Sequence, residues 1–141
     1  MSLRVYMNNI GIVVALATFC GIWFGHVFVR KIEFMSSTIW LPSGIFAVLG
    51  IGLEYLGLIS ADRQLSVAFA IFGITLLWDA LEFYRQQARI KKGHAPVNPN
   101  NPRHVRIMAK YPTATLDPFQ QNSADSRIIQ DLDTYPVDKQ S

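Results

Sequence analysis

Residues 65–83 read LSVAFAIFGITLLWDALEF, a largely apolar run that carries two acidic side chains near its end. A helix rises about 1.5 Å per residue, so a run of this length can cross the ~30 Å hydrocarbon core of a membrane. A charged side chain in that core is costly unless it faces other protein or water. Asp79 and Glu82 are three residues apart and share one helical face. We predict that this face makes the most important contacts of the chain.

Two further apolar runs lie before this one, at residues 10–29 and 38–58. The chain has 141 residues, of which 50% are hydrophobic and only 16% are charged. That composition is typical of a small integral membrane protein and not of a soluble domain. We therefore predict an all-α membrane protein with three transmembrane helices, over about residues 10–29, 38–58 and 65–84, within a membrane domain that spans residues 1–92.

The third helix is expected to continue past the membrane surface as a basic extension over residues 85–92. Basic side chains beside a membrane are attracted to anionic lipid. We expect four of them to contact lipid headgroups: Arg85, Arg89, Lys91 and Lys92.

Residues 93–141 differ from the rest of the chain in composition. Pro96, Pro99 and Pro102 recur every third residue, which argues against a helix or a central strand in this stretch. The remainder is polar, with apolar residues too sparse to form a core alone. We predict a Pro/Asn-rich linker and an extended, largely irregular cytoplasmic tail. The tail is expected to dock on a partner through its isolated apolar residues, which are Tyr111, Phe119, Ile128, Ile129 and Tyr135.

The basic residues also predict the orientation in the membrane. Three crossings place the loop between the first two helices on the same side as the C-terminal tail. That side holds eleven basic residues, whereas the other side holds only Arg4 and Arg63. Under the positive-inside rule we expect the N-terminus outside and the C-terminus in the cytoplasm, in the inner membrane of a bacterium.

Small residues recur at every fourth position in the first apolar run. Ala17, Gly21 and Gly25 form a strip with almost no side-chain bulk, which lets another helix backbone approach closely. The spacing predicts a helix-packing interface, whose partner helix belongs either to this chain or to another protein.

Four polar side chains are expected at similar depth in the first and third helices: His26, Arg30, Asp79 and Glu82. A contact between Asp79 and His26, or between Glu82 and Arg30, would define which helix faces which. The same groups can instead titrate in series and form a proton path. His26 beside a glycine also leaves room for a haem or a chlorophyll-type pigment, but a single histidine does not define such a site, so no cofactor and no metal are predicted.

Enzymatic chemistry has no support in the sequence. There is no Gly-rich phosphate loop, no paired metal-ligand motif and no nucleophile with a nearby base, so we expect neither an enzyme nor catalytic residues. The net charge of +3 is concentrated next to the membrane, which lipid explains better than a nucleic-acid partner does.

Residues 77–82 (LWDALE) and 89–99 (RIKKGHAPVNP) form a junction that resembles a family of short bacterial membrane proteins known only as a domain of unknown function. Its members have three apolar helices, a Trp-containing end of the third helix and a basic-Gly-aromatic-Pro-x-Asn-Pro element. His94 stands here in place of the aromatic residue. The resemblance covers about residues 11–103 and implies the three-helix fold, while it implies no activity.

Two functions are consistent with these patterns. The first is a non-catalytic accessory subunit of a larger membrane complex, such as a respiratory or photosynthetic one, docked through the small-residue strip and the tail. The second is a small transporter or proton-conducting module that uses His26, Asp79 and Glu82. An accessory subunit occurs once beside unlike chains, whereas three helices must associate with copies of themselves to enclose a path.

Overall fold

A computed structural model describes residues 9–119 and contains four helices in that range: α1 (Asn9–Met35), α2 (Trp40–Ile59), α3 (Arg63–Lys91) and α4 (Pro102–Lys110). No strand occurs among these described residues. The first three helices are each long and apolar enough to cross a membrane, which confirms the predicted all-α class with three long apolar helices. The chain divides into two compact units, here called the membrane unit (up to Gln87) and the C-terminal unit (from Ala88).

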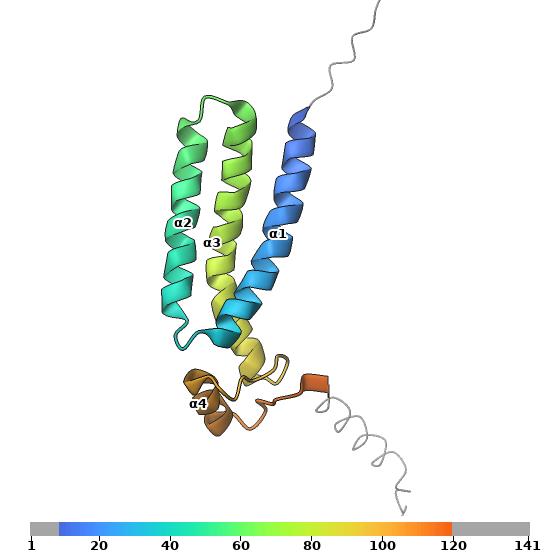
Figure 1. Cartoon of the computed structure of the whole chain (residues 1–141), viewed down its shortest axis with the longest axis vertical. Coiled ribbons are helices and arrows are strands. Elements are labelled where there is room, and N and C mark those ends of the chain that lie inside the picture. Colours follow the sequence, from blue (N-terminus) through green and yellow to red (C-terminus); the bar gives the residue numbers. More distant parts are fainter. Residues whose placement is uncertain (1–8, 120–141) are drawn as a thin grey trace, which may run out of the picture. The chain divides into compact units, whose positions relative to one another are not determined.

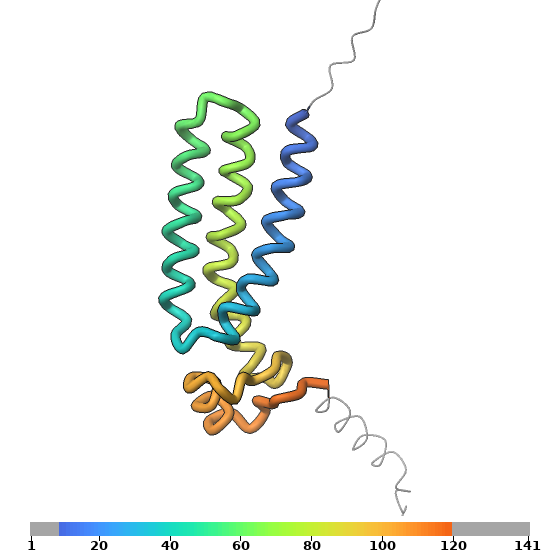
Figure 2. The backbone as a smooth tube through the Cα atoms, in the orientation of Figure 1, coloured from blue at the N-terminus to red at the C-terminus, as the bar shows by residue number. Residues whose placement is uncertain are grey.

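α3 is the central helix of the membrane unit, with α1 on one side and α2 on the other (Figure 1). The chain reverses direction after α1 and again after α2, so α1 and α3 run parallel and α2 runs antiparallel to both (Figure 2). α3 therefore forms an interface with each of the other two helices.

α2 packs on α3 through small residues and a hydroxyl group. A Cβ atom added at Gly50 would lie only 2.9 Å from the backbone oxygen of Gly73, so the two backbones approach closely there. Ser43 Oγ donates a hydrogen bond to the backbone oxygen of Ala80 at 2.7 Å. Close backbone approach and interhelical hydrogen bonds are what hold helices together when the surrounding lipid is as apolar as their side chains.

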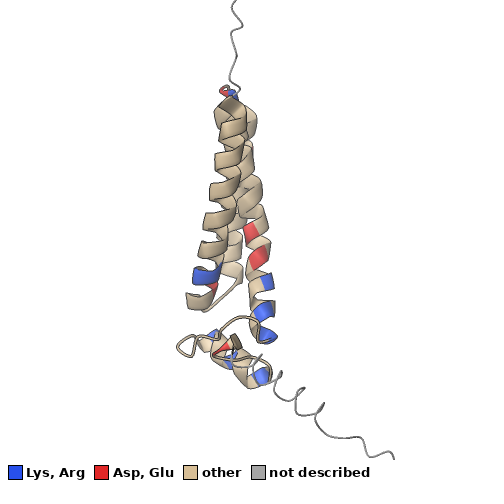
Figure 3. Cartoon of the chain, turned by 90° about the vertical axis from the view of Figure 1, so that its right-hand side faces the viewer, with Lys and Arg blue, Asp and Glu red and all other residues tan. Residues whose placement is uncertain are grey.

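The outer faces of the three helices are apolar. Phe19, Trp23 and Val48 expose 67%, 56% and 70% of their surface, respectively. In the view of Figure 3, charged residues of this unit are visible only near the helix ends and in the C-terminal half of α3. This distribution suits helices that face lipid, because charged groups in the hydrocarbon region are costly.

α3 ends inside the C-terminal unit in a glycine-dependent turn. Gly93 has a φ of 76°, which a residue without a Cβ adopts at no steric cost. Its N–H donates to the oxygen of Ile90 at 3.0 Å, and the N–H of His94 donates to the oxygen of Arg89 at 2.8 Å. These two bonds form a Schellman motif, which satisfies carbonyl groups left over at the helix end.

The C-terminal unit contains α4 in a region that we predicted to be irregular. Asn101 is the N-cap and its side chain accepts a hydrogen bond from the Arg103 N–H at 3.0 Å. Pro102 occupies the first turn, where its missing N–H removes no helical hydrogen bond. The repeated prolines therefore break a helix before Pro102 but allow one to start there.

The C-terminal unit also has a small core of its own. Ile90 from the last turn of α3 and Ile107 from α4 pack with Ala95 and Val97, and Tyr111 lies against this cluster. We expected the sparse apolar residues of this segment to be too few to form a core alone, and the core that they join includes Ile90 of α3. They pack against the apolar face at the end of α3, which we had predicted to belong to the membrane domain.

Replacing Asn101 by Ala is expected to destabilise α4 by about 1 kcal/mol, because one amide at the helix start loses its acceptor. Amide hydrogen exchange of the full-length protein in detergent should then be about fivefold faster in α4, since 1.4 kcal/mol corresponds to a factor of about ten. Asn100→Ala is the control, because Asn100 lies in the same turn but does not cap the helix. Equal exchange rates in the two variants would show that the cap contributes nothing.

Candidate functional site

The strip of small residues on α1 faces α3 of the same chain. Ala17, Gly21 and Gly25 are all buried. A Cβ atom added at Gly21 would lie 3.1 Å from Thr75 Oγ1, and one added at Gly25 would overlap the carboxylate of Asp79. The sequence left open whether the partner of this strip is internal or foreign, and the structure places α3 on it.

Asp79 lies in the middle of the interface between α1 and α3. Only 3% of its surface is exposed. Its carboxylate fills the space that a side chain at Gly25 would otherwise occupy. Its Oδ2 atom is buried and accepts no hydrogen bond from any residue in the described range 9–119. A buried carboxyl oxygen in this state is costly unless a proton, a cation or a hydrogen-bond donor reaches it.

Glu82 lies one turn further along the same face of α3 and is also buried, with 5% of its surface exposed. Its Oε2 atom is 3.5 Å from Nη1 of Arg85, three residues later on the same helix. The Arg85 guanidinium also stacks over the Trp78 ring, 4.2 Å from the ring centroid. Arg85 is thus held by an ion pair and a cation–π contact, and it places a positive charge beside the acidic face.

His26 follows Gly25, the residue of α1 that lies against Asp79. Its side chain is nevertheless exposed in the single chain, as is that of Arg30 one turn later. The four predicted polar residues therefore divide into two buried acids on α3 and two exposed basic groups on α1. Among the described residues, no three His, Cys, Asp or Glu side chains converge in the way that metal ligands do.

Besides Ser43, two buried polar residues of the membrane unit were not predicted from the sequence. Glu33 on α1 exposes 1% of its surface and Gln86 on α3 exposes 7%. Glu33 continues the line of buried residues at every fourth position after Gly25 and Val29. That spacing was visible in the sequence, but we ended the first helix at Val29 and so did not follow it.

The residues proposed for lipid contact and for docking have different environments. Arg85 belongs to the membrane unit, whereas Arg89, Lys91 and Lys92 belong to the C-terminal unit. Lys91 Nζ lies 5.2 Å from the centroid of the Tyr111 ring, which itself packs on the small core. Of the other expected docking residues, Phe119 is 83% exposed, while Ile128, Ile129 and Tyr135 lie outside the described residues.

Comparison with known proteins gives one match. A family model described as "Domain of unknown function (DUF4491)" matches residues 8–101. No curated protein matches the chain. No solved structure matches it either.

Proposed function

We propose that this chain, which belongs to the DUF4491 family, is a non-catalytic membrane protein that binds and passes protons at the acidic face of α3. The observation that carries the proposal is the buried Oδ2 atom of Asp79, which accepts no hydrogen bond within residues 9–119. An ionisable residue inside a membrane helix is rare and indicates a functional site by default, of which ion and proton pathways are one class. If Asp79 only held two helices together, a residue of the other helix would donate a hydrogen bond to this oxygen.

Proton transfer needs successive groups that exchange a proton, and α3 supplies two. Asp79 accepts a proton at a carboxylate oxygen and returns it, without forming or breaking any other bond. Glu82, three residues later on the same face, is the next group along the helix. Arg85 follows it at the end of the path and forms an ion pair with Glu82.

His26 supports an oligomeric form of the module. It lies within the apolar part of α1, yet its side chain is exposed in the single chain. Polar residues in membrane helices face protein or a water-filled cavity in preference to lipid. A second copy of the chain packed over this face of α1 would cover His26 and could enclose a path between the two copies.

Proton flux in vesicles tests the proposal. The full-length protein is reconstituted into liposomes that contain a pH-sensitive dye, and a potassium gradient with valinomycin drives protons inward. We expect acidification faster than in protein-free liposomes and in liposomes that contain an unrelated three-helix membrane protein. Acidification at the rate of these controls would contradict the proposal.

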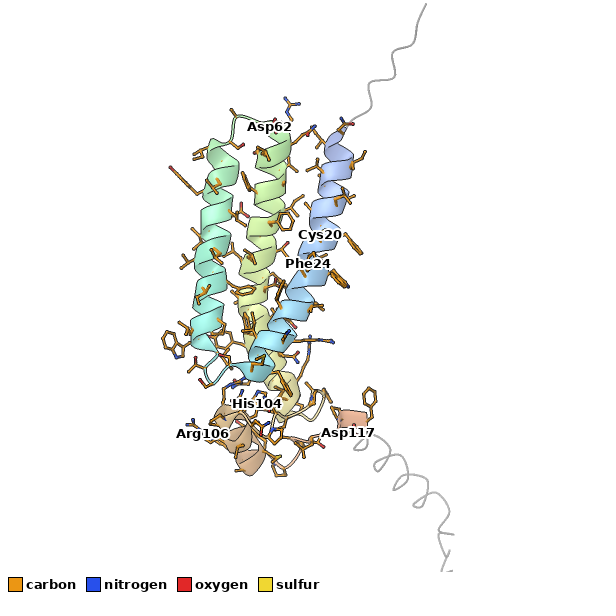
Figure 4. All side chains as sticks on the ribbon, viewed as in Figure 1. Cys20, Phe24, Asp62, His104, Arg106 and Asp117 are labelled. Atoms are coloured by element: carbon orange, nitrogen blue, oxygen red, sulfur yellow. The ribbon has the colours of Figure 1, made fainter. Side chains whose placement is uncertain are left out.

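The accessory-subunit hypothesis becomes the second candidate, because the strip that was to hold a foreign helix is occupied by α3. An aromatic cluster on the outer face of α1 supports it instead. Trp23 and Phe28 each contact the ring of Phe24, which Figure 4 labels on α1, and all three side chains are about half exposed. Purification in mild detergent separates the two functions, since unlike chains in fixed ratio favour a subunit and copies of this chain alone favour the proton module.

The charge asymmetry leads us to propose the inner membrane of a bacterium as the location, with the N-terminus outside. In a Cys20→Ser background, a membrane-impermeant maleimide added to intact cells should label Asp62→Cys and leave Lys110→Cys unlabelled. Asp62 lies in the short connection between α2 and α3, and Lys110 ends α4. The opposite labelling pattern would reverse the proposed orientation.

A further inference from the structure

The C-terminal unit carries a strong positive charge. Residues 88–119 contain six basic residues and one acidic residue, Asp117. The unit begins in the last turn of α3, a helix that is long and apolar enough to cross a membrane. Its basic residues are therefore tethered within a short distance of a bilayer surface, where anionic lipids attract them.

The outer face of α4 combines these charges with exposed apolar groups. Arg103, His104 and Ile107 point into the unit and are buried. Val105 and Met108 expose 44% and 38% of their surface on the other side. Helical spacing places Val105 at the centre of the outer face, with Met108 on one flank and two exposed basic residues on the other, Arg106 and Lys110.

Figure 4 shows the same division, with Arg106 at the edge of this unit and His104 towards its interior. Further exposed apolar side chains follow α4. Leu116 is 56% exposed and Phe119 is 83% exposed. Exposed apolar side chains among basic ones are typical of helices that lie in the headgroup region of a membrane. A surface that faces only water rarely gathers such residues.

We infer that the C-terminal unit is a lipid-binding module whose α4 lies on an anionic bilayer surface. Val105 and Met108 enter the boundary between headgroups and acyl chains, and Arg106 and Lys110 bind lipid phosphates. Buried partners within the unit hold α4 in place, since His104 Nδ1 accepts the Asn98 N–H at 2.9 Å and Ile107 belongs to the small core. These contacts fix which face of α4 points outward.

A fluorescent probe at Val105 tests this inference. Full-length Cys20→Ser/Val105→Cys protein is labelled with an environment-sensitive dye and reconstituted into phosphatidylcholine vesicles with or without phosphatidylglycerol. We expect blue-shifted emission and quenching by lipid-attached nitroxide only when phosphatidylglycerol is present. The matched control is a probe at Asn100, an exposed position in the polar turn before α4, which should respond to neither lipid.

The double variant Arg106→Glu/Lys110→Glu should release the Val105 probe from the bilayer surface. Each basic residue near an anionic surface contributes about fivefold to membrane association, so losing both lowers the bound-to-free ratio roughly 25-fold or more. Both side chains are exposed, and unchanged circular dichroism will show that the unit remains folded.

Three results would overturn the inference. The first is a Val105 probe that ignores phosphatidylglycerol, and the second is quenching that survives the double charge reversal. The third is a Val105 probe that responds to a soluble oligonucleotide added to neutral vesicles but does not respond to anionic lipid. The outer face of α4 would then bind a polyanion other than lipid. Proton flux does not enter this test, so its outcome is independent of the proposed function.

Discussion

Asp79→Asn is expected to reduce proton flux in proteoliposomes to the rate of protein-free vesicles. Asparagine has nearly the volume of aspartate, so it fits the space against Gly25 that the carboxylate occupies. Its amide does not take up and release a proton as a carboxylate does, so a path that passes through this position is interrupted. The helices should still associate, because the apolar and glycine contacts between α1 and α3 are unchanged. The loss of function should therefore occur without a loss of fold.

Glu54→Gln is the matched control for this experiment. Glu54 is the acidic residue of α2, is partly exposed and lies against Gly73, away from the contact between Gly25 and Asp79. Its amide variant should keep the flux of the parent protein, whereas Glu82→Gln should lose it as Asp79→Asn does. If Asp79→Asn and Glu54→Gln conduct equally, Asp79 is a structural residue and the proposed function fails.

Gly25→Ala is expected to destabilise the membrane unit by about 1–3 kcal/mol, the usual cost of adding bulk to a packed interface. The new methyl group would lie 2.8 Å from Asp79 Cγ and closer still to Oδ2, so either the Asp79 side chain must shift or α1 must move away from α3. The free energy of unfolding can be measured by steric trapping or by SDS titration in micelles. Gly25→Leu should prevent this packing altogether, because its side chain is larger.

Gly44→Ala serves as the control, since a Cβ atom there meets nothing within 4 Å. It changes the same residue type in a membrane-spanning helix without affecting an interface, and its stability should match that of the parent protein. The double variant Gly25→Ala/Asp79→Ala should recover part of the loss, because the second change removes the atoms that clash. Additive effects of the two changes would show that residues 25 and 79 are not in contact.

The number and positions of the spanning helices were predictable from the sequence because hydrophobic length is a local property. The runs at 10–29 and 65–84 each lie within one helix of the structure, and the run at 38–58 begins two residues before α2. The ends of the helices were less predictable. α1 continues through the charged residues after Val29, because Arg30, Lys31 and Glu33 form helix readily and no glycine or proline stops it before Met35.

α4 was missed because its stability depends on contacts far along the chain. Its nine residues are too few to form a stable isolated helix. Ile107 is held by Ile90 and Val97, which are separated from it by the proline-rich turn. The capping signal of Asn101 followed by Pro102 was present in the sequence, but the proline repeat around it suggested irregular structure.

The sequence by itself determined that this chain has three helices able to cross a membrane, that α1 carries a strip of small residues, and that two acids share one face of α3. The first follows from the length of the apolar runs and the other two from residue spacing within one helix. Only the tertiary structure decided that the strip faces α3, that Gly25 accommodates Asp79 and that His26 is exposed. Spacing along one helix does not determine which helix approaches it, because that choice depends on how all three helices pack together.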